Sequence, residues 1–299
     1  MVATVSVILP VYNRSSSLEH AMRSVLDQSY RDLELIVVDD ASTEDLRPVV
    51  DRFGDPRVSY VRLAVNGGAS AARNAGLAAA EGRFIAFQDS DDLWLPNKLK
   101  MQIDLLEGLP PEIGVVLHSK VLYGSGPDGS YGVGLVSMRP PPNRMMLPGE
   151  DQVRKYLIEN RISLQNALFR RDCYPDARWF DDVTRSNADW AFTSSLAQHT
   201  KIAEYPDPVV MAFSSPDGIS KLKRAKAIGL IRIVKRNRAA YARYPDAYGM
   251  MMWRIGRILA RHGKRRMARR FYIEGFKNDP GFLWRALTER LRTLRIRGT

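Results

Sequence analysis

The stretch RFIAFQDSDDLWLP, residues 83–96, places three carboxylates within four positions directly after an apolar run. Residues 83–87 have the length and composition of a buried β-strand, and Asp89, Asp91 and Asp92 follow its end. Aspartates are also common at helix starts, so the alternative is that these side chains cap a helix that begins near Pro96. The two interpretations predict different surroundings for the three carboxylates.

Three similar apolar runs precede this one and alternate with helix-forming segments. The four runs span residues 5–9, 33–38, 58–63 and 83–87. Between the first two, five apolar residues recur with helical spacing: Leu18, Ala21, Met22, Val25 and Leu26. Ser15 to Ser17 precede them and offer N-cap hydroxyls. This alternation predicts a doubly wound, mostly parallel α/β sheet, which binds ligands at the carboxyl ends of its strands.

Glycine-rich phosphate-binding signatures are missing from the ends of these runs. The first run leads into PVYNR rather than a G-x-G-x-x-G turn, and no G-x-x-x-x-G-K-[ST] segment occurs. The four histidines lack zinc-site spacing, and the single cysteine, Cys173, excludes an internal disulfide. The remaining candidates for ligand binding are the carboxylates of Asp89, Asp91 and Asp92 and those of Asp39 and Asp40. Their hard oxygen atoms favour Mg²⁺ or Mn²⁺, bound together with substrate phosphates.

The net charge of +12 is concentrated in the C-terminal part of the chain. Residues 1–110 carry 11 Lys and Arg against 16 Asp and Glu, residues 111–220 carry 11 against 13, and residues 221–299 carry 23 against 4. We therefore predict a boundary near residue 220, with a first domain over 1–220 and a basic helical extension over 221–299. The hydrophobic content of 45% is ordinary for a globular protein, and the start lacks the features of a secretory signal, so we expect a cytoplasmic location.

Apolar residues of the extension also recur with helical spacing. One stripe consists of Met251, Ile255, Ile258 and Leu259, Gly263 interrupts the pattern, and a later stripe consists of Leu283, Leu287, Leu291 and Leu294. The pattern predicts three amphipathic helices. Their basic faces either bind an anionic membrane surface or stay exposed while the helices pack on the first domain. Binding of nucleic acid is a further alternative, but no helix-turn-helix, zinc or RNA-recognition motif supports such a partner.

Four collinear segments resemble the motifs of family 2 glycosyltransferases, which are inverting enzymes with the GT-A fold. The segments are VSVILPVYNR (5–14), SVLDQSYRDLELIVVDDAS (24–42), NGGASAARNAG (66–76) and GRFIAFQDSDDLWLPNKL (82–99). The match is strong over residues 4–107 and continues more weakly to about residue 213. The resemblance implies transfer of a sugar from a nucleoside-diphosphate sugar, with a UDP-sugar favoured, to a glycan or lipid-linked acceptor in polysaccharide or glycoconjugate synthesis.

The resemblance also implies roles for individual residues of the donor site. Pro10 and Tyr12 would flank the nucleotide base, with Tyr12 stacked on it, and Asp40 would accept a hydrogen bond from the polar edge of the base. Arg73 matches an arginine that reaches the nucleotide, although on its own it would be a solvated helix residue. For Tyr12 the alternative is a core aromatic residue at a turn.

QDSDD matches the metal-binding D-x-D signature of the family. Asp91 would coordinate Mg²⁺ or Mn²⁺ that bridges the donor diphosphate, and Asp89 would contact the ribose or support the metal. Asp92 is expected to cap the following helix. The cation would neutralise the charge that develops on the departing diphosphate.

An inverting transfer also needs a general base for the acceptor hydroxyl. The segment SNADWAFTSSLAQ, residues 186–198, occupies the position where the family carries an acidic pair before an aromatic residue, which makes Asp189 the candidate base. Ala188 departs from that pattern, so Asp181 or Asp182 is an alternative base, and a catalytically inactive member of the fold is an alternative function. For Asp189 itself the alternative is an acid in the first turn of a helix.

Two Gly- and Pro-rich stretches separate the halves of the catalytic domain. Residues 123–134 and 138–149 contain turn-forming residues throughout, so we predict loops. Long loops over an active site often act as lids, so we expect these two to become ordered when nucleotide or acceptor binds. The alternative is an exposed insertion without a role.

Overall fold

Strands and helices alternate through the first hundred residues, as the apolar runs predict. The computed structural model describes residues 3–126, 131–147, 149–182, 186–214 and 223–281. Its strands are β1 (Val5–Val11), β2 (Leu33–Asp39), β3 (Val58–Arg62), β4 (Phe84–Phe87), β5 (Leu93–Trp94), β6 (Ile113–Ser125), β7 (Tyr131–Arg139), β8 (Ala167–Arg170) and β9 (Lys201–Phe213). The four predicted strands are thereby confirmed as β1 to β4.

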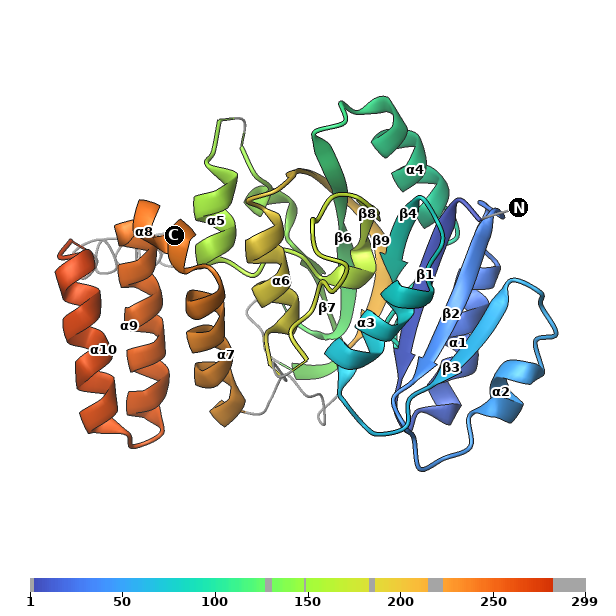
Figure 1. Cartoon of the computed structure of the whole chain (residues 1–299), viewed down its shortest axis with the longest axis horizontal. Helices are drawn as coiled ribbons and strands as arrows, with labels where there is room; N and C mark the ends of the chain where they lie inside the picture. Colours follow the sequence, from blue (N-terminus) through green and yellow to red (C-terminus); the bar gives the residue numbers. More distant parts are fainter. Residues whose placement is uncertain (1–2, 127–130, 148, 183–185, 215–222, 282–299) are drawn as a thin grey trace.

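The helices follow the same chain order, and Figure 1 shows their positions around the sheet. They are α1 (Ser15–Leu26), α2 (Arg47–Asp51), α3 (Ala69–Ala79), α4 (Lys98–Gly108), α5 (Gln152–Ile158), α6 (Ala188–Leu196), α7 (Lys223–Arg236), α8 (Arg238–Arg243), α9 (Pro245–Arg261) and α10 (Arg265–Asn278). Two short 3₁₀ turns, η1 (Pro142–Arg144) and η2 (Leu164–Asn166), lie in the connections.

The strands form one mixed sheet in the order β3-β2-β1-β4-β8-β6-β9-β5, with β7 paired to β6. The pairs β2–β3, β1–β2, β1–β4 and β6–β9 are parallel, whereas β8, β5 and β7 pair antiparallel to their neighbours. The sheet is thus doubly wound and mostly parallel, as predicted. Because β1, β2, β4, β6 and β9 run in one direction, their carboxyl ends lie along one edge, at the bottom of Figure 1.

Each face of the sheet carries its own apolar core. Val5, Val7 and Leu9 of β1 pack toward α1, α2 and α4, whereas Ile8 points to the other face, toward α3 and α6. The five apolar residues predicted for the first helix are the buried residues of α1. The predicted N-cap is wrong, because Ser15 already belongs to the helix and the cap position is Arg14, without a side-chain hydrogen bond.

The prediction of a loop over residues 123–134 is wrong. β6 continues to Ser125, and β7 begins at Tyr131, so the segment is a β-hairpin whose tip, 127–130, lies outside the described residues. Pairing with β9 and β7 extends the strands through a glycine-rich stretch, since β-structure depends more on cross-strand neighbours than on local preference. Residues 138–149 are largely irregular, as predicted, and their ordering on binding stays a prediction.

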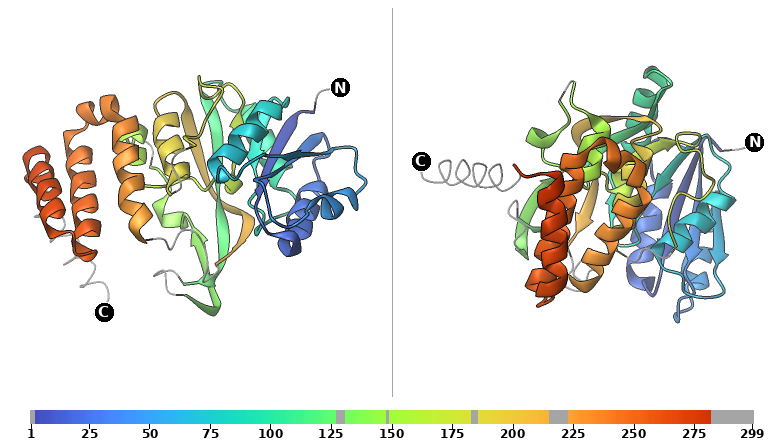
Figure 2. Two further views of the ribbon diagram at one scale, coloured as in Figure 1. Left: turned by 60° about the horizontal axis from the view of Figure 1, so that its bottom comes forward. Right: turned by 60° about the vertical axis from the view of Figure 1, so that its left-hand side comes forward.

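The described helices after residue 220 pack on the preceding part of the chain. Met251 and Ile255 of α9 join a buried cluster with Leu157 of α5 and Trp190 of α6. Gly263, with φ +73°, forms the predicted break between α9 and α10. The stripe from Leu283 to Leu294 lies outside the described residues. The left-hand view of Figure 2 shows α10 as the outermost of the described helices, at the end of the molecule opposite β3.

Gly76 lets α3 approach β1 closely. A Cβ atom at Gly76 would lie 2.4 Å from Cγ2 of Ile8, which is fully buried in β1. Since buried side chains are close-packed, neither residue has room to move without disturbing its neighbours. The position of α3 on the sheet therefore depends on this glycine.

We predict that Gly76→Ala destabilises the protein by roughly 1–3 kcal/mol, because overpacking outweighs the gain of ~1 kcal/mol in helix propensity. Gly108→Ala is the matched control, since a Cβ atom there meets nothing within 4 Å. Urea unfolding of the two variants checks the prediction. Equal stability of both variants would contradict it.

Candidate active site

The predicted donor-site residues gather at the carboxyl edge of the sheet. Pro10 lies buried near the end of β1, opposite Val38 of β2, and the side chain of Tyr12 follows it with 44% exposure. Gln88, directly after β4, donates its backbone N–H to the carbonyl of Ile8. The ends of β1, β2 and β4 therefore surround one region, which is the position predicted for a ligand.

Asp40 connects the end of β2 with the loop that follows β3. Its Oδ1 accepts a hydrogen bond from the backbone N–H of Gly67 at 2.8 Å, and its Oδ2 accepts one from Gly68 at 2.7 Å. Gly68 has φ +83°, a conformation that favours glycine. Asp40 thus fixes the turn that leads into α3. Each carboxylate oxygen has a second lone pair, so its predicted contact with the base stays open.

Asp39 forms a network that sequence reasoning missed. The side chain is fully buried, and it accepts hydrogen bonds from the N–H of Ser42, from the Tyr60 hydroxyl at 2.6 Å and from Arg62 at 2.8 Å. Burial alone would raise the pKa of Asp39, but the hydrogen bonds from Ser42 and Tyr60 and the charge of Arg62 together lower it. The network therefore holds Asp39 ionised directly beside Asp40.

Arg73 of α3 lies against the carboxylates that follow β4. Its Nη2 donates to Oδ1 of Asp89 at 3.0 Å, and its guanidinium lies 5.7 Å from the ring centre of Phe180. Only 13% of the Arg73 side chain is exposed. The structure thus brings together two predicted donor-site residues that lie sixteen positions apart in the sequence.

Asp91 pairs with Arg14, a residue that sequence reasoning did not single out. Nη1 of Arg14 lies 2.8 Å from Oδ2 of Asp91, and both side chains are 38% exposed. Burial and the nearby charge of Asp89 raise the pKa of Asp91, while Arg14 opposes the shift. Arg14 ends the quoted segment VSVILPVYNR, and this position directly after β1 was the signal that could have identified it.

The prediction that Asp92 caps the next helix is wrong. α4 begins at Lys98 after Asn97, and no side chain caps it by a hydrogen bond. Asp92 is buried instead, and its carboxylate accepts hydrogen bonds from Nε2 of Gln165 at 2.6 Å and from the N–H of Phe213 at 3.1 Å. Burial, followed by the charge of Asp89, raises its pKa to about 7. Five residues separate Asp92 from α4, and the first two of them form β5, so Asp92 lies too far from the helix start to cap it.

Asp89 and Asp91 have the donor chemistry for a divalent cation. They are two carboxylates on one turn, and each uses one oxygen in its arginine pair, which leaves a second oxygen available for a hard cation. Among the described residues, no group of three or more His, Cys, Asp or Glu side chains has the arrangement of a metal site. The two aspartates therefore fit a cation that takes its remaining ligands from phosphates and water.

Asp189 lies in the first turn of α6, and Figure 1 shows this end of the helix at the same lower side as the carboxyl ends of the strands. Its Oδ2 accepts a hydrogen bond from Nδ2 of Asn160 at 2.9 Å. Asp182, one of the two alternative bases, is engaged by Nδ2 of Asn74 at 2.8 Å and by Arg178. A Cβ atom at Gly229 of α7 would lie 2.4 Å from the Ser186 carbonyl, so α7 packs closely against the start of α6.

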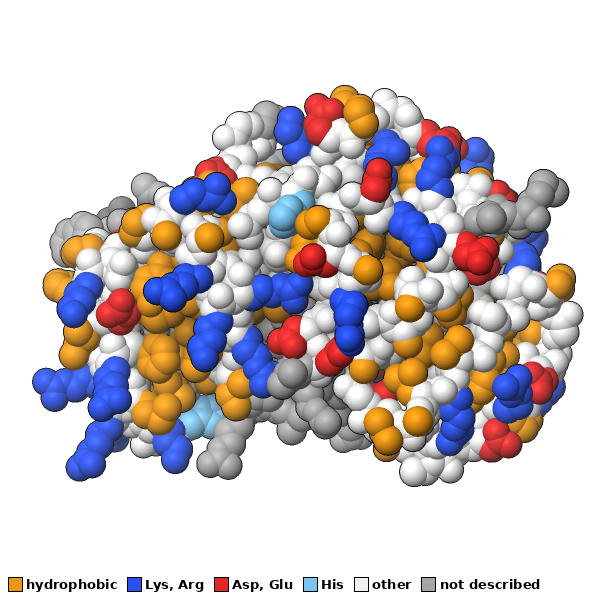
Figure 3. Space-filling model, in the orientation of Figure 1, with side chains coloured by type: hydrophobic (Ala, Val, Ile, Leu, Met, Phe, Trp, Pro, Cys, Tyr) orange, Lys and Arg blue, Asp and Glu red, His pale blue; other side chains and the backbone are white. Residues whose placement is uncertain are grey.

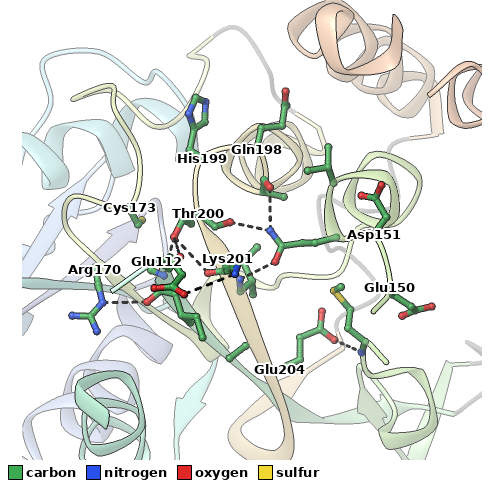
Figure 4. A pocket seen from close by; sticks show the side chains of 18 of the residues that line it. Glu112, Glu150, Asp151, Arg170, Cys173, Gln198, His199, Thr200, Lys201 and Glu204 are labelled. Atoms are coloured by element: carbon green, nitrogen blue, oxygen red, sulfur yellow. Dashed lines mark hydrogen bonds and ion pairs between the residues drawn. The ribbon is translucent and has the colours of Figure 1, made fainter. Parts of the chain in front are cut away.

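A hollow lies at the opposite edge of the sheet. It has a volume of about 840 Å³ and is lined by the starts of β6 and β9, the end of α6 and the start of α5. Figure 4 shows Glu112, Gln198, Thr200, Lys201 and Glu204 around it. Every predicted site residue lies outside its lining.

Comparison with known proteins agrees with the motifs. The model of glycosyl transferase family 2 matches residues 6–173. A glucosyltransferase of Escherichia coli, WfgD, named for UDP-Glc and α-D-GlcNAc-diphosphoundecaprenol, is 45% identical over 102 residues, which are 34% of this chain and 40% of the relative. The putative teichuronic acid biosynthesis glycosyltransferase TuaG of Bacillus subtilis is 44% identical over 104 residues, 34% and 41% of the two chains. The matches thus span about 40% of these relatives.

Solved structures share the fold at low sequence identity. The mannosyltransferase PcManGT of Pyrobaculum calidifontis, in complex with GDP-Man and Mn²⁺, aligns with a TM-score of 0.64 at 18% identity, over 99% of this chain and 81% of the other. TarS 1–349 of S. aureus, in complex with UDP-GlcNAc, aligns with a TM-score of 0.60 at 18% identity, over 94% and 91%. These neighbours are GT-A transferases, and the predicted GT-A fold is confirmed. Because the family model covers more than half of the chain, the protein belongs to glycosyl transferase family 2.

Proposed function

We propose that this protein is a metal-dependent, inverting glycosyltransferase that moves a sugar from a nucleoside-diphosphate sugar, a UDP-sugar in the first instance, to an acceptor hydroxyl. The observation that carries the proposal is the convergence of Tyr12, Asp40, the Arg73–Asp89 pair and the Arg14–Asp91 pair at one sheet edge. The relatives named for UDP-Glc and the GT-A neighbours with bound nucleotide sugars support it.

The donor would lie along the carboxyl ends of β1, β2 and β4. Tyr12 stacks on the base, Pro10 lies at its side, and Asp40 accepts a hydrogen bond from its edge. Asp91, assisted by Asp89, would hold Mg²⁺ or Mn²⁺, which supplies neutralisation of the charge on the leaving diphosphate. Arg73 and Arg14 already lie at these carboxylates, so their guanidinium groups are placed to contact the phosphates when the cation takes the carboxylate oxygens.

Asp189 would remove the proton from the acceptor hydroxyl as the hydroxyl attacks the anomeric carbon from the face opposite the diphosphate. A base for this step must reach the acceptor, and the start of α6 faces the same edge as the donor residues. The hydrogen bond from Asn160 orients the Asp189 carboxylate and leaves Oδ1 for the proton.

We further propose a glycan or lipid-linked acceptor and a peripheral position at the cytoplasmic face of a membrane. The described residues contain no helix that is both long and apolar enough to cross a membrane. Between Arg257 and Lys277, eight Lys and Arg face one acidic residue, Glu274. Figure 3 shows Lys and Arg side chains gathered at the lower left, over the α9–α10 connection, and this connection lies on the same side as the proposed site. A single anionic surface could thus contact both.

Thermal unfolding tests the donor site. With UDP at about 100 times its dissociation constant and Mn²⁺, we expect stabilisation of ~2.7 kcal/mol, a rise of several degrees, that disappears with a chelator or in Asp91→Asn. The same measurement with GDP, TDP and CMP shows which nucleotide base the site prefers. Asp104→Asn, an exposed aspartate on α4 that pairs with Lys100, is the control and should keep the shift. The proposal fails if the wild type shows no shift with any of these nucleotides in the presence of metal.

Replacement of the general base separates catalysis from binding. Asp189→Asn should lower kcat by roughly 10²–10⁴-fold, because proton removal is lost, and should keep the nucleotide shift. The assay for kcat uses a sugar donor that carries the nucleotide found to stabilise the protein, with a lipid extract as the source of acceptor. It measures release of that nucleotide. Asp182→Asn is the comparison: a larger loss there than in Asp189→Asn would move the base to Asp182.

Flotation with vesicles tests the membrane contact. Wild-type protein should float with vesicles that contain anionic lipid and not with neutral ones. Arg266→Glu/Arg270→Glu should lower the partition at least tenfold, since each basic residue near the surface contributes ~1 kcal/mol. Arg23→Glu/Arg83→Glu makes the same charge change far from α10 and is the control. Equal flotation of the two variants would exclude α10 as the contact.

A further inference from the structure

One face of the sheet beside the proposed donor site carries exposed and half-buried apolar side chains in two rows. The first row crosses β5, β9, β6 and β7 and consists of Leu93, Met211, Val121 and Met138, which are paired in register. The second row crosses β9, β6 and β7 and consists of Phe213, Tyr123 and Val136. We call these seven residues the apolar strip. Residues directly opposite, or two apart along a strand, point to the same face of a sheet.

The strip is accessible rather than part of a core. Phe213 and Tyr123 are each 41% exposed, Val136 is 50% exposed and Met211 is 37% exposed. Their neighbours Val210 and Ala212, which point to the other face, are buried. A strand with one solvated face normally alternates apolar and polar residues, but in β9 the residues on both faces are apolar from Val210 to Phe213. Contiguous exposed apolar surface of this kind indicates a binding surface.

The strip begins at the carboxylates of the proposed metal site. Leu93, at one end, lies two residues after Asp91, and the N–H of Phe213 donates to Asp92 at 3.1 Å. Adjacent strands are ~4.8 Å apart, so the first row extends roughly 14 Å from the donor site to Met138. A molecule whose hydroxyl reaches the donor would therefore have its remaining atoms over this surface.

We propose that the apolar strip binds the hydrocarbon chain of the acceptor, an alkyl or isoprenoid chain attached to the sugar that receives the transferred residue. This inference rests on the proposed function. Among the seven side chains, only Tyr123 has an N–H or O–H group, so the strip lacks the polar groups that orient a sugar ring. A flexible hydrocarbon chain needs only apolar area, because the hydrophobic effect is non-directional. The strip continues directly from the turn that carries Asp89, Asp91 and Asp92, and this favours the acceptor over a second copy of this chain as the occupant.

Alkyl β-D-glucosides of increasing length, used below their micelle concentrations, probe the strip. Binding measured by calorimetry should be undetectable for methyl glucoside and should strengthen on the order of tenfold from hexyl to octyl, since two further methylene groups are buried. Tyr123→Ser/Val136→Ser should remove most of this chain-length dependence. Both side chains are exposed, so the double variant should fold, and its thermal unfolding checks this.

Leu147→Ser is the matched control, because Leu147 is 66% exposed and lines the hollow at the opposite edge of the sheet. Binding that does not depend on chain length, or a strip variant that binds octyl glucoside like the control, would overturn the proposal. A wild-type dimer in sedimentation that the strip variant abolishes would also overturn it and assign the strip to a second copy. Absence of a nucleotide shift in the wild type, with octyl glucoside still bound at the strip, would instead reject the proposed glycosyl transfer.

Discussion

Mutual repulsion among Asp89, Asp91 and Asp92 is the constraint around which the site is organised. Three carboxylates within four residues repel one another, and the repulsion is offset either by donors and positive charges or by a raised pKa, as at Asp92. Arg73 of α3 lies at Asp89, Arg14 after β1 lies at Asp91, and the amide groups of Gln165 and Phe213 bind Asp92. These partners come from four separate segments. The turn formed by residues 89–92, the acidic turn, thereby fixes the positions of the segments that surround it.

α3 transmits this arrangement to the second half of the chain. Arg73 contacts the acidic turn, while the next residue, Asn74, exchanges hydrogen bonds with the backbone of Phe180 and donates to Asp182. The segment that leads to α6 is thus held by the same helix that holds Asp89. Because Gly76 sets the distance from α3 to β1, a shift of the helix would move both halves of the proposed site together. The packing of Gly76 therefore affects the proposed site, although Gly76 itself does not contact the site residues.

The sequence predicted the elements that have a local apolar pattern. It did not predict the contacts between residues that are far apart in the chain. The four strands and the buried face of α1 followed from apolar periodicity, which is local. The Arg14–Asp91 pair joins residues 77 positions apart, and no spacing rule reports such a contact. Asp92 was assigned to the helix nearest in sequence, but β5 intervenes and its pairing with β9 carries Asp92 into the core. The β6–β7 hairpin was missed because its glycines indicate turns, whereas β9 stabilises the strand across the sheet.

The hollow at the opposite edge illustrates why size alone does not locate a site. Its polar groups are largely used within the chain: Glu204 pairs with buried Arg161 at 2.6 Å, and Gln152 donates to the carbonyls of Ala197 and Thr200 and accepts from Ile202. A ligand there would compete with bonds that join three elements. At the carboxyl edge, by contrast, Asp91 and Arg14 form a pair that is more than a third exposed, and such a pair contributes little to stability. Groups that the fold can release at little cost are those that a charged donor and a cation can engage.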